Sequence, residues 1–83
     1  MAAARVKLPL GLSELLKDDM LRVIDQANLG VENTQIAKMY FIDGTPQMDI
    51  ALVVGYDRST ITKRLHKITD RAAVTAQRLG LFH

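Results

Sequence analysis

Cysteine and tryptophan are absent from this chain of 83 residues, and only 5% of its residues are aromatic. Without cysteine there can be no disulfide framework and no thiolate zinc site, which is typical of a protein in a reducing cytoplasm. The apolar runs are far too short to span a bilayer, and no long apolar segment marks a signal peptide. We therefore expect a cytoplasmic protein with a largely aliphatic core.

Acidic residues are scarce in the last third of the chain. From Arg58 onward Asp70 is the only acid, although six of the eleven Lys and Arg residues lie there. The net charge is only +2, so the positive charge is local rather than general. Either this region is a solvated helix face, or it faces an anionic partner such as nucleic acid.

Residue constellations that carry enzyme chemistry are also missing. The chain shows no paired carboxylates on one face, no nucleophile beside a base and no phosphate-binding loop. His66 and His83 are its only histidines, and neither has companion ligands at metal-binding spacing. We expect no enzyme activity, no cofactor, no metal site and no small-molecule ligand.

The length fits a single domain over residues 1–83, and 48% hydrophobic residues are enough for a core. Pro9 and Gly11 would interrupt any helix in residues 1–11, so we expect this segment to be an N-terminal arm. Ser13 is a suitable N-cap for a first helix, and Gly30 suits the left-handed position after it. The apolar face of this helix would consist of Leu12, Leu16, Met20, Val23, Ile24 and Ala27.

Three further helices are expected. The second begins near Asn33 or Thr34 and ends at Asp43-Gly44, although Asp-Gly can also mark a β-hairpin. Thr45 would cap the third helix, with Pro46 in its first position. Their buried residues would be Ile36, Ala37, Tyr40 and Phe41, then Ile50, Ala51 and Val54.

The fourth helix begins after a good N-cap, Asp57. Its apolar side would be Ile61, Leu65, Ile68 and Ala72, at four-, three- and four-residue steps. Thr69-Asp70 either breaks it or lets it continue to Leu79. The expected fold is all-α, a small helix-turn-helix DNA-binding domain of four or five helices.

The helix-turn-helix prediction, over residues 45–68, depends on spacing. Two steeply crossed helices need a small residue where they come closest, and Ala51 supplies it. The sharp turn needs a residue tolerant of positive φ, which Gly55 supplies four residues later. Ile61 then packs the second helix against the first. The alternative is an ordinary α-hairpin in which a glycine lies between the two helices by chance.

The opposite face of helix 58–68 is polar and basic. Arg58, Ser59, Thr62, Lys63 and His66 lie opposite Ile61 and Leu65, and all five can donate hydrogen bonds. Such a helix can donate to base edges and phosphates in the DNA major groove.

Residues 47–66 resemble the helix-turn-helix of phage Cro-type repressors, in Gln47, Ala51, Gly55, Ser59, Ile61, Lys63 and His66. The longer span of residues 34–68 is similar to the KorA/TrfB group of plasmid transcriptional repressors, in which a Val-Asp-Gly-like turn precedes Pro-Gln. Residues 42–47, Ile-Asp-Gly-Thr-Pro-Gln, match that arrangement. A weaker similarity connects the chain with PapB-type fimbrial regulators.

The resemblance implies a role for each polar residue of the motif. Arg58 and Lys63 would bind guanine O6 and N7 or, alternatively, phosphates, whereas Ser59 and Thr62 suit either. His66 would contact a base or a phosphate at the far end of the helix. The residues expected at the DNA backbone are Gln47, Thr60, Arg64 and Lys67.

The chain departs from these families at two positions. Tyr56 stands where an aliphatic residue usually follows the turn glycine, and Arg64 stands near a position that is often buried and apolar. Leu65 would then take over the packing and rotate the helix, which shifts the DNA-facing residues by about one position.

The resulting hypothesis is a sequence-specific regulator of double-stranded DNA, most simply a homodimeric, plasmid-encoded, autorepressing repressor on a palindromic operator. Residues 70–83 would supply a compact dimerisation segment. The alternative is a protein-interaction module or a sigma-like adaptor that uses the same helical hairpin. Duplex binding that depends steeply on salt would separate the two.

Overall fold

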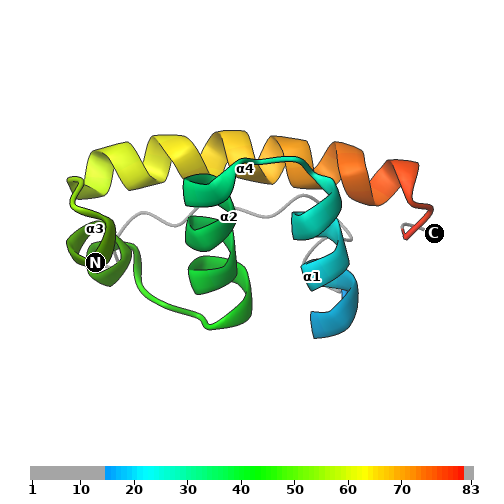
Figure 1. Cartoon of the computed structure of the whole chain (residues 1–83), viewed down its shortest axis with the longest axis horizontal. Helices are drawn as coiled ribbons and strands as arrows, with labels where there is room; N and C mark the ends of the chain where they lie inside the picture. The colour runs from blue at the N-terminus through cyan, green and yellow to red at the C-terminus, as the bar shows by residue number, and fades with distance from the viewer. Residues whose placement is uncertain (1–14, 82–83) are drawn as a thin grey trace, which may run out of the picture.

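The computed structural model describes residues 15–81, and these are helical, without strands. The order is α1 (Lys17–Gln26), α2 (Val31–Ala37), a π-helical turn η2 (Lys38–Ile42), α3 (Gln47–Val54) and α4 (Arg58–Arg78). The all-α prediction is therefore confirmed for this part of the chain. In Figure 1, α4 is a long rod, and α3, α2 and α1 lie along one side of it, α3 nearest its N-terminal end.

α1 begins at Lys17, and the residue before it, Leu16, is extended and forms no side-chain cap. The expected cap, Ser13, and the expected core residue Leu12 lie outside the described residues. Leu16 itself is 74% exposed, so its predicted burial is wrong. It precedes the helix, and the helical spacing that placed it on the apolar face does not apply to it. The rest of that face is buried as expected: Met20, Val23, Ile24 and Ala27.

The junction between α1 and α2 differs from the prediction by a few residues. Asn28, not Gly30, takes the left-handed conformation after α1, with φ of 55°. Gly30, with φ of 86°, is instead the N-cap of α2, which consequently begins at Val31 rather than near Asn33 or Thr34. Asparagine tolerates positive φ better than most residues, so it can end α1 and leave Gly30 to start the next helix.

The prediction that a helix ends at Asp43-Gly44 is confirmed, and the β-hairpin alternative is wrong. α2 continues into η2, whose wider turn is closed by a 3.1 Å hydrogen bond from the Asp43 amide to the Lys38 carbonyl. Gly44 follows with φ of 68°. Tyr40 and Phe41 were expected in the core, yet both are only half-buried, with their rings edge to face at 5.2 Å.

α3 begins one residue later than the capping signals indicate. Pro46 is the N-cap rather than the first helical residue, and no side-chain hydrogen bond caps this end. The Thr45 amide donates to the Met39 carbonyl at 2.8 Å, so Thr45 completes the preceding turn through its backbone. Proline suits both the N-cap and the first helical position, because its fixed φ is compatible with a helix start and it has no amide proton to leave unpaired.

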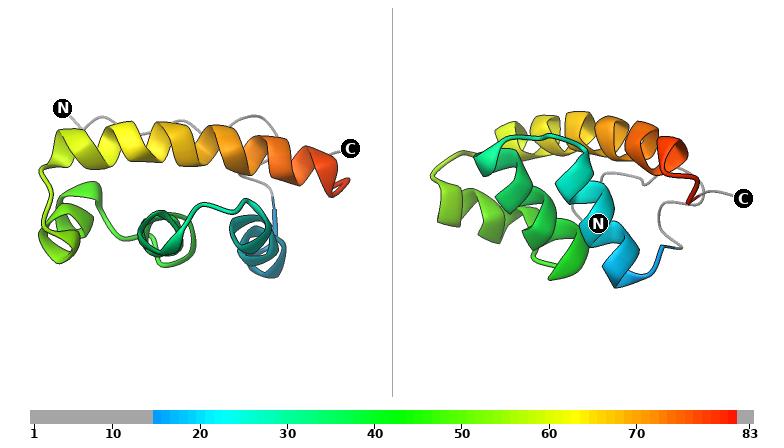
Figure 2. Two further views of the ribbon diagram at one scale, coloured as in Figure 1. Left: turned by 45° about the horizontal axis from the view of Figure 1, so that its top comes forward. Right: turned by 45° about the vertical axis from the view of Figure 1, so that its right-hand side comes forward.

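Isoleucines from all four α-helices meet in the core. α1, α2 and α3 each contribute one isoleucine, namely Ile24, Ile36 and Ile50. α4 contributes Ile61, Leu65 and Ile68, and all six side chains are at most 1% exposed. Figure 2 shows the three short helices on the same side of α4 in both views. The core is thus a single layer of aliphatic side chains between α4 and the other helices.

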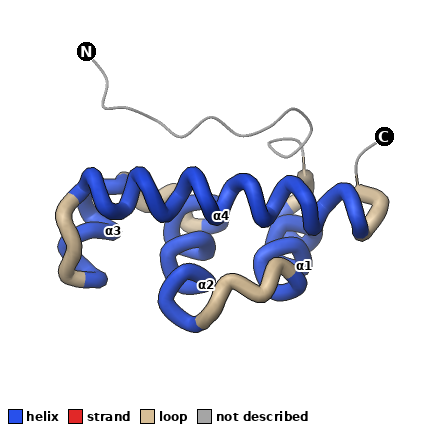
Figure 3. The backbone as a smooth tube through the Cα atoms, turned by 90° about the horizontal axis from the view of Figure 1, so that it is seen from above, coloured by secondary structure: helices blue, strands red, loops and turns tan. Residues whose placement is uncertain are grey.

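α4 is one unbroken helix of 21 residues, so Thr69-Asp70 does not interrupt it. It crosses the whole molecule when seen from above (Figure 3). At 1.5 Å per residue it is about 31 Å long. Its C-terminal half is joined to α1, because Arg71 donates to the Ala27 carbonyl at 3.1 Å and Arg78 donates to the Gln26 carbonyl at 3.3 Å. Both arginines thus satisfy carbonyls at the negative end of the α1 dipole.

We predict that Gly55→Ala destabilises the fold by about 1 kcal/mol, because Gly55 has φ of 82° and an L side chain is strained there. A Cβ at this position would meet no atom within 4 Å, so backbone strain is the only cost. Gly55→Asn should cost less, since asparagine tolerates this conformation. Urea unfolding would measure both changes, and equal losses for the two variants would contradict this explanation.

A second prediction concerns Thr69, whose buried hydroxyl has no hydrogen-bond partner among the described residues. Thr69→Val replaces that hydroxyl with a methyl of similar shape and should stabilise the fold by about 1 kcal/mol. Thr69→Ser, which keeps the hydroxyl and loses the methyl, should destabilise it. Thermal unfolding of the two variants beside the parent decides the matter, and a lower Tm for Thr69→Val would show that the hydroxyl is satisfied.

Candidate nucleic-acid interface

The turn between α3 and α4 has the residues that a steep helix crossing requires. Ala51 is 5% exposed and lies one turn before the bend, and the Gly55 and Tyr56 amides both donate to its carbonyl, at 2.9 and 3.1 Å. Gly55 is left-handed, and Ile61 is fully buried. The predicted spacing of Ala51, Gly55 and Ile61 therefore corresponds to a tight turn between two packed helices.

α4 begins at a well-formed cap, as its sequence indicates. The Asp57 carboxylate accepts the Thr60 amide at 2.8 Å and the Ser59 hydroxyl at 3.1 Å. Hydrogen bonds from the side chain and then the backbone of Thr60 hold the pKa of the Asp57 carboxyl below its ordinary value. The carboxylate satisfies a backbone amide at the positive end of the α4 dipole, and the cap sets the start of α4 at Arg58.

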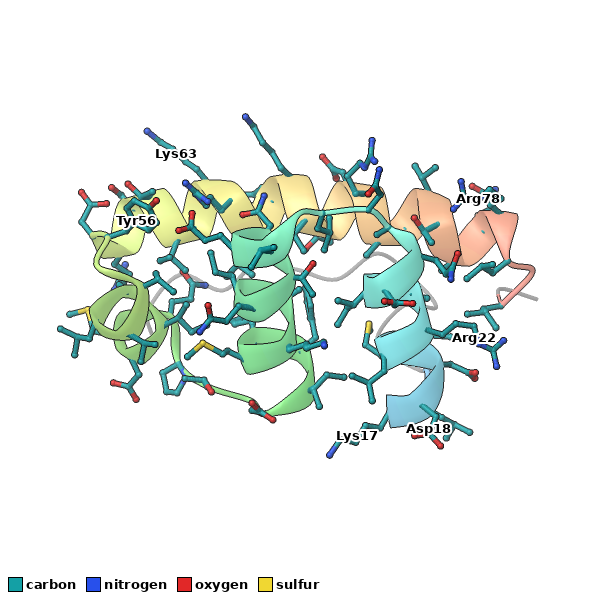
Figure 4. The ribbon with its side chains drawn as sticks, viewed as in Figure 1. Lys17, Asp18, Arg22, Tyr56, Lys63 and Arg78 are labelled. Carbon is teal, nitrogen blue, oxygen red and sulfur yellow. The ribbon has the colours of Figure 1, made fainter. Side chains whose placement is uncertain are left out.

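Most of the predicted DNA-facing residues of α4 are open to solvent. Arg58, Ser59, Lys63, His66 and Lys67 are exposed. Figure 4 shows Lys63 pointing away from the other three helices. Within residues 15–81, no hydrogen bond or ion pair uses the side chains of Arg58, Lys63, His66 or Lys67. The outer face of the first half of α4 is thus exposed, basic and rich in donors.

Gln47 and Thr62 are placed differently, because they contact each other. Gln47 is only 8% exposed, and its Oε1 accepts the Thr62 hydroxyl at 2.5 Å. Thr62 is half-buried beside it. This arrangement favours a role for Gln47 in joining α3 to α4 over the predicted phosphate contact, and it leaves Thr62 at the edge of the outer face.

Arg64, predicted to contact phosphate, belongs to a polar cluster beside α4. Its Nη1 donates to Glu32 Oε1 and, at 3.1 Å, to Asn33 Oδ1. Its guanidinium lies 4.6 Å from the centroid of the Tyr56 ring. The Tyr56 hydroxyl donates to the same Glu32 oxygen at 3.0 Å. The two residues that depart from the family pattern, Tyr56 and Arg64, are therefore partners.

The predicted shift of the DNA-facing residues depends on how Leu65 and Arg64 are placed around α4. Leu65 is fully buried, as expected if it takes over the packing, and Arg64 turns sideways towards α2. Lys63 and His66 remain on the outer face. Thr60 is half-buried and lies on the flank of the helix that also carries Arg64 and Lys67.

Glu32 and Asn33 were missed by the sequence reasoning. They precede Arg64 by more than thirty residues, and no local pattern relates positions so far apart. The only available signal was the arginine at a usually apolar position, which implies a polar partner somewhere in the fold.

Other kinds of site find little support in the described residues. No group of three or more His, Cys, Asp or Glu side chains in that region could hold a metal ion. Within the same residues, no helix is both long enough and apolar enough to cross a membrane.

No protein-family model, curated protein or solved structure matches this chain.

The Asp57 cap gives a pH-dependent prediction. Because its pKa is lowered in the folded state, the carboxylate stabilises the fold at neutral pH, and this contribution is lost as the pH falls through the folded pKa. Asp57→Asn keeps an acceptor but has no charge to lose. The Tm advantage of the parent over Asp57→Asn should therefore shrink between neutral pH and about pH 3. An advantage that stays constant over this range would mean that the charge has no part in the cap.

Proposed function

We propose that this chain is a sequence-specific double-stranded DNA-binding transcriptional regulator that reads the major groove with the first half of α4. The observation that carries the proposal is the exposed basic face at Arg58, Lys63, His66 and Lys67, next to a tight turn with the residue spacing of a helix-turn-helix. No acid lies between Arg58 and Lys67, so nothing on this stretch repels phosphate.

Arg58 and Lys63 are the proposed readers of guanine. Both are exposed and project from the first two turns of α4, where a recognition helix enters the groove. Ser59 and His66 lie on the same open side and would add contacts to bases or phosphates. Lys67, one turn after Lys63, would contact the DNA backbone and set the position of the helix along the groove.

A homodimeric repressor is the form we favour. Repression needs only occupancy of a promoter, and the resemblance of residues 34–68 to KorA/TrfB repressors favours a plasmid-borne, autorepressing protein. Two copies would place their recognition helices about 34 Å apart on a palindrome. Residues 70–83 were expected to supply the dimerisation segment, and in that segment Leu79 and Leu81 pack against the core of the same chain. Within residues 70–81, Val74 is the large exposed apolar side chain, at 65% exposure.

A specific observation also favours the protein-interaction alternative. α3 exposes Met48, Leu52 and Val53, at 60%, 80% and 62%. An apolar helix face of this kind suits a protein partner better than it suits DNA. Under this alternative, α3 rather than the C-terminal residues would form the contact, and the chain would not bind duplex DNA in a salt-dependent way.

The test is fluorescence anisotropy with two labelled duplexes, one from upstream of the chain's own coding sequence and one a scramble of it. Selection from random duplexes would follow if neither binds tightly. We expect nanomolar binding to the upstream or selected duplex, much weaker binding to the scramble and a steep fall in affinity with salt. No duplex binding at low salt, even after selection, would exclude the proposal and favour the protein-interaction alternative.

Two substitutions separate base reading from phosphate contact. Arg58→Ala should cost about 1–3 kcal/mol on the specific duplex and relax the preference at one base pair per half-site. Lys67→Ala should weaken binding to all duplexes alike and reduce the salt slope by about one. Competition titrations with single base-pair variants of the duplex would measure both. An equal loss for Arg58→Ala on specific and scrambled DNA would exclude a base-reading role.

A further inference from the structure

Four side chains from three elements form a closed polar cluster beside α4. Tyr56 comes from the turn, Arg64 from α4, and Glu32 and Asn33 from the first turn of α2. Arg64 donates to both Glu32 and Asn33, Tyr56 donates to Glu32, and the Arg64 guanidinium covers the Tyr56 ring. Tyr56, Arg64 and Glu32 therefore contact one another pairwise, and each contact joins two different elements.

The geometry distinguishes this cluster from an ordinary surface ion pair. The side chains of Arg64 and Glu32 are 31% and 45% exposed, and an isolated pair at such exposure contributes little. Here, however, Arg64 has a carboxylate, an amide oxygen and an aromatic face as partners. A planar guanidinium held in this way loses its freedom to rotate, so the helix that carries it is held too.

The cluster has a counterpart on the other flank of α4. Thr62 and Arg64 are two residues apart, so they project about 200° apart around the helix, with Lys63 between them. Thr62 is bonded to Gln47 of α3, and Arg64 is bonded to Glu32 of α2. These two contacts oppose rotation of α4 in either direction. Rotation by one residue, about 100°, would move Lys63 from the outer face to a flank.

We propose that Glu32 and Tyr56 are positioning residues for DNA reading, which hold Arg64 and thereby fix the rotation of α4 with Lys63 facing outwards. This inference rests on the proposed function. It assigns Arg64 a different role from the phosphate contact expected from the sequence, because the guanidinium is already bonded to Glu32. It also explains the presence of Tyr56 after the turn glycine, where the ring and the hydroxyl each have a partner.

Arg64 could either position α4 or bind phosphate, and these two roles predict different results for Glu32→Gln. If Glu32 positions the helix, its loss should lower the ratio of specific to scrambled binding by about tenfold, the size of one charge-assisted contact. If Glu32 merely restrains an arginine that binds phosphate, its loss should raise affinity for both duplexes and leave the ratio unchanged. Tyr56→Phe, which changes no charge, should lower the ratio in the same direction by a smaller factor.

Asp70→Asn is the matched control. Asp70 is exposed on α4, so Asp70→Asn removes one negative charge, as Glu32→Gln does on α2, and no hydrogen bond or ion pair connects Asp70 with the cluster. It should raise affinity for both duplexes slightly and keep their ratio within about twofold. Thermal unfolding of every variant would verify that each is folded at the temperature of the titration.

The experiment compares the four proteins on the duplex selected by the parent and on its scramble. A parent that binds no duplex specifically would overturn the proposed function and this inference together. A parent that binds specifically, beside a folded Glu32→Gln variant with an unchanged ratio, would overturn only the inference. A lower ratio for Glu32→Gln and Tyr56→Phe, and not for Asp70→Asn, is the result that the positioning role predicts.

Discussion

All three short helices pack against one apolar face of α4, and the rest of the structure depends on that burial. Ile61, Leu65 and Ile68 form this face, and each meets aliphatic residues of the other helices in a single core layer. A domain of this size buries a modest share of its surface, so it has no second core to replace this one. Because three helices share one side of α4, its opposite side remains open over the first half of its length.

This separation of faces would let fold stability and the proposed DNA recognition use different residues of the same helix. Within residues 15–81 the basic side chains of the open side form no hydrogen bond or ion pair that an anion would have to replace, and the buried side holds the helix in place. The polar contacts on the two flanks, Gln47 with Thr62 and Glu32 with Arg64, lie between these faces. They define the rotation of α4 more narrowly than aliphatic packing alone would, since hydrogen bonds are directional and apolar contacts are not.

Much of the fold could be predicted from local signals. Asp57 as a cap, Gly55 as a left-handed turn and the four- and three-residue steps from Ile61 to Ala72 each depend on residues close in sequence, and each is found in the structure. Several of the errors lie at helix ends. Asn28 and Gly30 can both adopt positive φ, and tertiary packing decides which one ends α1 and which one starts α2.

The candidate site was predictable only in part, because only some of its features depend on residues that are close in sequence. The exposed residues Lys63, His66 and Lys67 follow from the helical period once the apolar face is known, and Arg58 is exposed as the first residue of α4. The engagement of Gln47 and Arg64 does not, because their partners are distant in sequence and the contacts form only when the helices are packed. The exposed apolar residues of α3 also escape such a pattern, since that helix is apolar on nearly every side.

We propose that the first half of α4 is the surface that meets DNA. The most direct measurement is an NMR titration of ¹⁵N-labelled protein with the duplex that binds it, following the backbone amide signals. We expect the largest shifts at Arg58 to Lys67 and small shifts on α1, which lies at the other end of the molecule (Figure 1). Shifts confined to α1 or to the exposed apolar residues of α3, with residues 58–67 unchanged, would contradict the account.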